Sequence, residues 1–255
     1  MPFAYEPLLV LLVGAFYPFL RISAFLMASP FFGDGWLPPR FLLALALALT
    51  SLVVATHAPL PKIEPFSGEG LLAGGAEVIV GIAMGLVFRF VIGGFLFIGH
   101  VAGLQMGLGF GEFIDPLYGA QVPLVSQFFN YFVILLALAS GAHLALIELV
   151  ATSFSRIPTG TLPGEGVLRD TLTFFPYVFL AAIRVSLPVV VGLLLVSFAF
   201  GVVTRIAPQL NIYSVGFSLM IPLGFLILYA MLGQIWPSFS AILENAFAMT
   251  FAWKS

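Results

Sequence analysis

Long uninterrupted runs of apolar residues alternate with short polar, turn-rich segments along the whole chain. Six of these runs approach or exceed the roughly 20 residues that a helix needs to cross a bilayer. They cover residues 8–32, 41–56, 71–101, 124–152, 174–204 and 212–236. The pattern therefore predicts an all-α integral membrane protein with about six long hydrophobic helices, packed as helical hairpins.

Proline and glycine punctuate this pattern. Pro18, Pro188 and Pro222 fall inside predicted helices, where a proline removes one backbone hydrogen bond and bends the helix. Residues 153–173 are the clearest linker, because Pro and Gly recur through them. We therefore expect a front four-helix region over residues 1–152, and a rear helical hairpin with a C-terminal tail over residues 174–255.

The composition agrees with a membrane protein and narrows its chemistry. The chain is 61% hydrophobic and 8% charged, against roughly a quarter charged in soluble domains. A net charge of −2 gives no reason to expect a nucleic-acid partner. The chain has no cysteine, its three histidines are scattered, and no catalytic or phosphate-binding motif is present. We predict a non-enzymatic protein without cofactor or metal.

Five charged residues interrupt the apolar runs. Each would cost about 2.5–3.5 kcal/mol at the centre of a bilayer. We expect these side chains to face one another, neighbouring subunits or water, although misplaced helix ends and arginines that extend to the interface would also accommodate them. They are Arg21, Glu77, Arg89, Glu148 and Arg184.

Glycines recur at every fourth position from Gly99 to Gly111. Such spacing is typical of close contact between membrane helices. The ladder, however, continues into a segment with Glu112 and Asp115 that ends the helix at Pro116. A glycine-hinged, phenylalanine-bearing segment between two apolar runs also fits a re-entrant plug or gate, which we place at residues 103–123.

Two further stretches have an unusual order of residues. The connection 205–217 contains Pro208, Gln209 and Asn211, which suit a tight, structured turn, although an ordinary polar helix hairpin would have the same chemistry. Residues 21–33 contain small side chains, including Ala24 and Ala28, that would permit close helix packing before Pro30 closes the helix.

These three stretches together resemble the FliR family, the flagellar export-gate component, and its injectisome counterpart. The segments that carry the resemblance are R-I-S-A-F-L-M-A-S-P-F-F-G, G-L-Q-M-G-L-G-F-G-E-F-I-D-P and R-I-A-P-Q-L-N-I-Y-S-V-G-F. The resemblance implies a hetero-oligomeric export gate, largely outside a conventional bilayer arrangement. In it, a FliP-like front half and a FliQ-like rear hairpin would pack with FliP-type and FliQ-type subunits.

The resemblance also implies FlhB-type and FlhA-type gate proteins, exported unfolded polypeptides and membrane lipids as partners. It implies a location in the bacterial inner membrane, within the flagellar basal body. One departure from the family pattern is Ser218 and Met220, which replace a proline and a lysine that are common there.

The same resemblance implies the site residues. Met106, Phe110 and Phe113 would form the apolar seal of a plug, and the glycines of this segment would make the plug mobile. The residues expected in the plug are Met106, Gly107, Gly109, Phe110, Gly111, Phe113, Asp115 and Pro116. The residues expected at subunit contacts are Arg21, Pro30, Glu77, Arg89, Arg205, Pro208, Gln209 and Asn211. The alternatives are a secondary transporter with broken helices, and the injectisome branch of the same gate.

Overall fold

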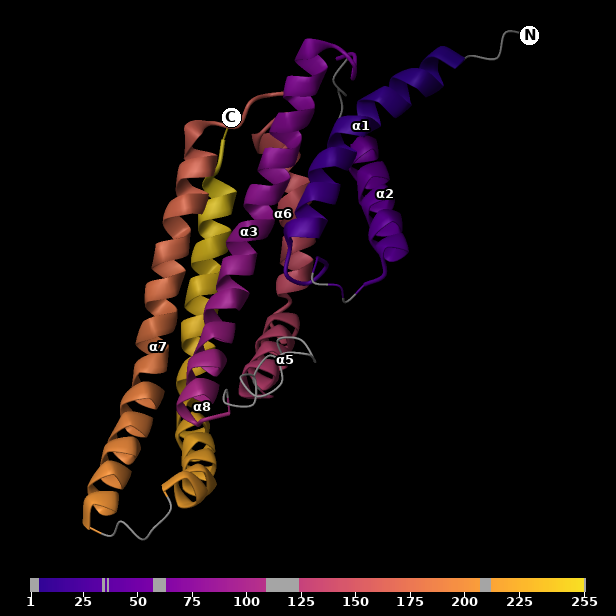
Figure 1. The fold of residues 1–255 in the computed structure, drawn as a ribbon. Helices are drawn as coiled ribbons and strands as arrows, with labels where there is room; N and C mark the ends of the chain where they lie inside the picture. The colour runs from indigo at the N-terminus through magenta and orange to yellow at the C-terminus, as the bar shows by residue number, and fades with distance from the viewer. Residues whose placement is uncertain are drawn as a thin grey trace. The chain divides into compact units, whose positions relative to one another are not determined.

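The computed structural model of the chain describes residues 5–33, 35, 37–56, 63–108, 124–206 and 212–254. Within these residues the structure contains seven α-helices and no β-strand (Figure 1). The helices are α1 (Tyr5–Ala28), α2 (Pro39–Thr56), α3 (Gly68–Gln105), α5 (Leu124–Ala139), α6 (Ala142–Arg156), α7 (Glu165–Ile206) and α8 (Ile212–Ala252). The all-α prediction is confirmed.

The helices differ from the apolar runs in three main places. The predicted linker 153–173 is shorter in the structure, because α6 extends to Arg156 and α7 already begins at Glu165. The run 124–152 forms two helices, α5 and α6, bent by 65°. The break falls at Gly141, whose φ of 74° is a left-handed conformation that glycine adopts without strain. At the other end of the chain, α8 continues past Trp236 and through Pro237 to Ala252.

Four of the described helices are long and apolar enough to cross a membrane, namely α2, α3, α7 and the Ser218–Ala252 part of α8. The bent pair of α5 and α6 would make a fifth span. Together these helices support an integral membrane protein.

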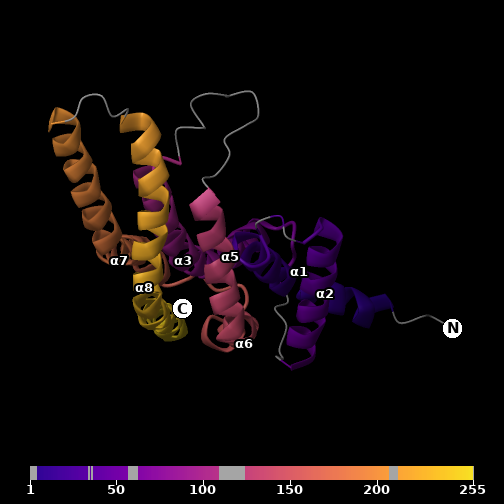
Figure 2. The same cartoon turned by 90° about the horizontal axis from the view of Figure 1, so that it is seen from below.

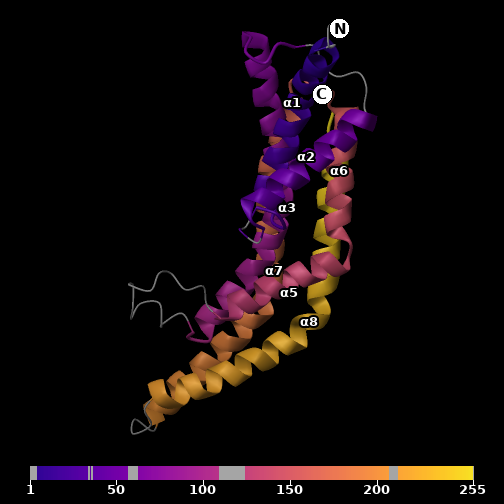
Figure 3. The same cartoon turned by 90° about the vertical axis from the view of Figure 1, so that its right-hand side faces the viewer.

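The chain divides into two compact units. Unit 1 comprises Met1–Phe90, Leu138–Pro176 and Leu243–Ser255, and unit 2 comprises Val91–Ala137 and Tyr177–Ile242. Helices α3, α7 and α8 each contribute one part to each unit. Within unit 1, α1 and α2 lie side by side (Figure 2). Within unit 2, α7 and α8 run alongside each other (Figure 3).

In unit 1, α1 crosses α3 at two glycines with almost no space between the helices. A Cβ atom at Gly81 would lie 2.9 Å from the Cβ of Ala24, and one at Gly85 would lie 2.5 Å from the Cβ of Ala28. The expectation that the small residues of α1 permit close packing is confirmed. Glycine at every fourth position of α3 supplies the other half of the contact.

In unit 2, the second part of α3 packs against three other helices through aromatic rings. Phe95 meets Phe239 of α8 with 5.3 Å between ring centroids, and Phe97 meets Phe179 of α7 at 5.2 Å. A Cβ atom at Gly99 would lie 2.6 Å from the Cβ of Phe129 in α5. This part of α3 is thus the central element of the unit.

Candidate functional site

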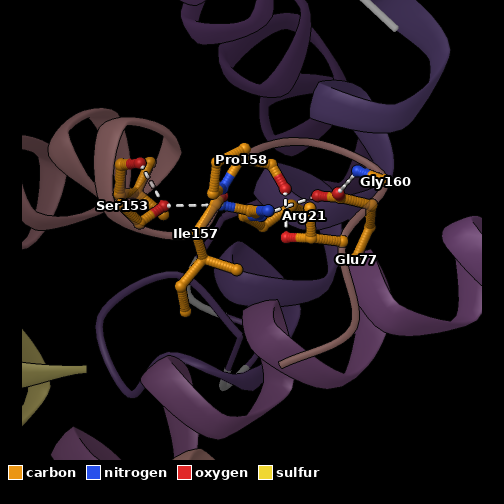
Figure 4. A network of polar contacts seen from close by, with 8 residues as sticks. Arg21, Glu77, Ser153, Ile157, Pro158 and Gly160 are labelled. Carbon is orange, nitrogen blue, oxygen red and sulfur yellow. Dashed lines mark hydrogen bonds and ion pairs between the residues drawn. The ribbon is translucent and has the colours of Figure 1, made fainter. Parts of the chain in front are cut away.

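Unit 1 contains a fully buried ion pair between α1 and α3. The Nε of Arg21 donates to Oε2 of Glu77 at 2.6 Å, and neither side chain is exposed (Figure 4). The prediction that interior charges face one another is confirmed for these two residues. The side chains of Arg89, Glu148 and Arg184 are exposed on the chain, and for them the expectation of neighbouring subunits or water stays a prediction.

Arg21 also holds the end of α6. Its second nitrogen, Nη1, donates to Oγ of Ser153 at 3.2 Å and to the carbonyl oxygen of Ile157 at 3.0 Å. The guanidinium carbon lies 4.3 Å from the centre of the Phe154 ring, a cation–π contact. Among the described residues, Nη2 of Arg21 has no hydrogen-bond partner.

Glu77 holds the turn that follows α6. The backbone N–H of Gly160 donates to Oε1 of Glu77 at 2.9 Å (Figure 4). Gly160 has a φ of 85°, which favours glycine at this turn. The predicted linker therefore includes a turn that is docked on the front helices. Removing one partner of such a buried charge pair is strongly destabilising, because it strands the other charge.

Arg156, which sequence reasoning did not single out, makes a second contact of the same kind. It donates to the carbonyl oxygen of Phe251 and lies over the ring of the same residue, 4.7 Å from its centre. Trp253, two residues further, is buried. The C-terminal end of α6 is thus bonded to two other helices. Arg21 of α1 donates to it, and Arg156 in its last turn donates to the end of α8. A basic residue just before a proline–glycine turn was the only sequence signal for this role.

The predicted plug begins at a well-defined helix end in unit 2. The N–H of Gly107 donates to the carbonyl of Leu104, and the N–H of Leu108 donates to the carbonyl of Gly103, both at 3.0 Å. With a φ of 79° at Gly107, this is the Schellman arrangement that closes an α-helix. In the structure, Gly107 has the left-handed conformation that ends α3.

Met106, predicted as part of the seal, is fully buried in unit 2 against Gly224 of α8. The other end of the predicted plug is also attached to this unit. There, Val125 and Ser126 at the start of α5 are buried, and Oγ of Ser126 lies 3.5 Å from Nδ1 of His100.

The remaining predicted residues are scattered or lie outside the described part of the chain. Pro30 is buried just after α1, whereas Arg89 in α3 and Arg205 in the last turn of α7 are exposed. Outside the described residues lie Gly109, Phe110, Gly111, Phe113, Asp115, Pro116, Pro208, Gln209 and Asn211. Their roles, and those of all the subunit-contact residues, stay predictions.

Comparison with known proteins identifies the family. The family described as "Bacterial export proteins, family 1" matches residues 12–246. The "Flagellar biosynthetic protein FliR" of Escherichia coli (strain K12) is 31% identical over 223 residues, covering 87% of this chain and 85% of that protein. The protein of the same name from Bacillus subtilis (strain 168) is 32% identical over 236 residues, covering 91% and 89% respectively. This chain therefore belongs to the bacterial export proteins, family 1.

Proposed function

We propose that this protein is a subunit of the flagellar type III export gate, where it forms part of the channel that carries flagellar proteins across the bacterial inner membrane. The match of the export family to nearly the whole chain carries this conclusion. The similar proteins named above are flagellar, which favours the flagellar branch over the injectisome branch. The long apolar helices are in keeping with a membrane site in the basal body.

The surface of α7 supports assembly with other hydrophobic subunits. Over an apolar stretch of 18 residues in α7, only 11% of the residues are buried. Large side chains such as Leu195 and Phe198 are exposed on the chain. An apolar surface of this extent requires lipid or partner helices. We assign it to FliP-type and FliQ-type subunits.

We expect the protein to be recovered in a hetero-oligomer when it is co-expressed with FliP-type and FliQ-type subunits. Expressed alone, it should give low yield or aggregate, because the apolar surface of α7 would lack its partner helices. Native mass spectrometry of the detergent extract measures both outcomes. A stable monomer that ignores these subunits would contradict the assignment, and a homo-oligomer would favour a transporter.

We further propose that residues 103–123 form the plug that closes the resting channel. The glycine and phenylalanine content of this segment supports the proposal, as does the attachment of both of its ends to unit 2. Apolar rings can fill a narrow lumen, and glycines keep the local stability low enough for the segment to yield to a passing polypeptide.

The test is to replace residues 109–123 with a short glycine–serine linker. We expect ion conductance through the assembled complex to rise by an order of magnitude or more, because nothing then fills the lumen. The same replacement at residues 57–62 is the control, and it should leave conductance unchanged. If the deletion keeps conductance at the wild-type level in an intact complex, the segment is not a plug.

A further inference from the structure

Gly224 of α8 lies directly against the side chain of Met106. A Cβ atom at Gly224 would lie 2.5 Å from Cγ, 2.6 Å from Sδ and 2.8 Å from Cε of Met106. Three consecutive atoms of the methionine thus lie across the glycine. Real Cβ atoms do not come this close to other heavy atoms, so any side chain at position 224 would displace Met106.

This contact is made by Met106, the first residue after the end of α3 at Gln105. Met106 still donates its N–H to Ala102 at 2.9 Å, and Gly107 then takes the left-handed conformation. The helix end sets the direction of the departing chain, and the methionine against Gly224 sets its position. A flexible thioether suits such a role because it fits an irregular notch closely.

Other glycines of α8 show that the notch is local. Around Gly216 and Gly233, no heavy atom would lie within 4 Å of an added Cβ atom. A general need for close helix packing along α8 would not single out Gly224. The absence of a side chain at this position is therefore explained by Met106.

We infer that Gly224 and Met106 form the seat of the proposed plug, a fixed contact that positions the base of the plug and does not move when the channel opens. The inference rests on the proposed function and deepens it, because it separates the stationary base from the part that yields. Met106 is in this view a positioning residue and not part of the moving seal.

The first test compares Gly224→Ala with Gly233→Ala, which adds the same atom to the same helix in open space. We expect Gly224→Ala to raise conductance several-fold at unchanged complex yield and melting temperature, and Gly233→Ala to leave it at baseline. Met106→Ala should give a similar rise, and the double variant should leak no more than either single variant, because both changes remove one contact. If Gly224→Ala and Gly233→Ala give the same conductance, the inference that Gly224 and Met106 seat the plug is wrong.

The second test locks the seat with a disulfide, and it covers the case in which Gly224→Ala does not assemble. The chain has no cysteine, so Met106→Cys with Gly224→Cys introduces a single reactive pair. A stationary seat predicts that the oxidised complex exports protein at the rate of the reduced one and keeps baseline conductance. Export that stops on oxidation and returns on reduction would show that the base moves, which overturns the inference.

These results separate the two proposals. If replacing residues 109–123 opens the channel but Gly224→Ala does not, the seat is wrong and the plug stands. If the replacement leaves the channel closed, the plug itself is wrong, whatever the glycine variants do.

Discussion

Glu77→Ala is expected to lower the free energy of unfolding by about 3–5 kcal/mol, since it leaves the guanidinium of Arg21 buried without its counter-charge. The substitution also removes the acceptor for the N–H of Gly160. We expect a large drop in the melting temperature of the purified complex. Glu148→Ala, at an exposed carboxylate in α6, is the control and should change the melting temperature little.

A double replacement distinguishes a stranded charge from a general loss of packing. Arg21→Met with Glu77→Leu removes both charges and keeps most of the volume, and it should recover a large part of the stability that either single change loses. If the double variant is as unstable as the sum of the single variants, the pair contributes through its hydrogen bonds to Ser153, Ile157 and Gly160 and not through charge balance.

Gly85→Ala is expected to destabilise the packing of α1 on α3 by about 1–3 kcal/mol, the usual range for overfilling a close-packed site. The added Cβ atom would lie 2.5 Å from the Cβ of Ala28 and 2.8 Å from its carbonyl carbon. Because one obstacle is backbone, the two helices must separate. The better helix propensity of alanine, about 1 kcal/mol, offsets part of this loss.

Gly75→Ala is the matched control, because Gly75 lies on the same helix with no heavy atom within 4 Å of the added Cβ atom. Here only the gain in helix propensity operates, so we expect unchanged or slightly higher stability. We expect the melting temperature to fall for Gly85→Ala and to stay the same or rise slightly for Gly75→Ala. A stabilising Gly85→Ala would mean that α1 and α3 are not in tight contact.

The helices were predictable because apolar runs of membrane length are a strong signal. The ends of the helices are harder to predict. Gly141 breaks an apolar run without any change in hydropathy, and α8 continues through Pro237, just beyond the predicted end of its run at residue 236. The contact of the turn at Gly160 with Glu77 could not be predicted either, because proline and glycine indicate a turn but not the residues that it contacts.

Contacts within the candidate sites were mostly beyond sequence reasoning. Arg21 and Glu77 were each recognised as costly, yet their pairing spans 56 positions, and one sequence carries no information on which interior charges meet. Gly224 gave no signal at all, because a lone glycine in an apolar helix has many explanations. The sequence predicts Met106 as part of the plug, but only its contact with Gly224 distinguishes the base of the plug from its seal.

The position of the Arg21 network along the chain has a consequence for biosynthesis. Arg21 is synthesised 56 residues before Glu77 and 136 residues before Ile157. At about 5–20 residues per second, the nascent chain carries an unpaired arginine for several seconds, and an incomplete network for up to about half a minute. A ribosome that stalls before Glu77 leaves Arg21 without its counter-charge, and one that stalls before the turn at Gly160 leaves the pair without its remaining hydrogen bonds. Fragments that end before Glu77 thus carry a charged side chain that the finished protein buries completely.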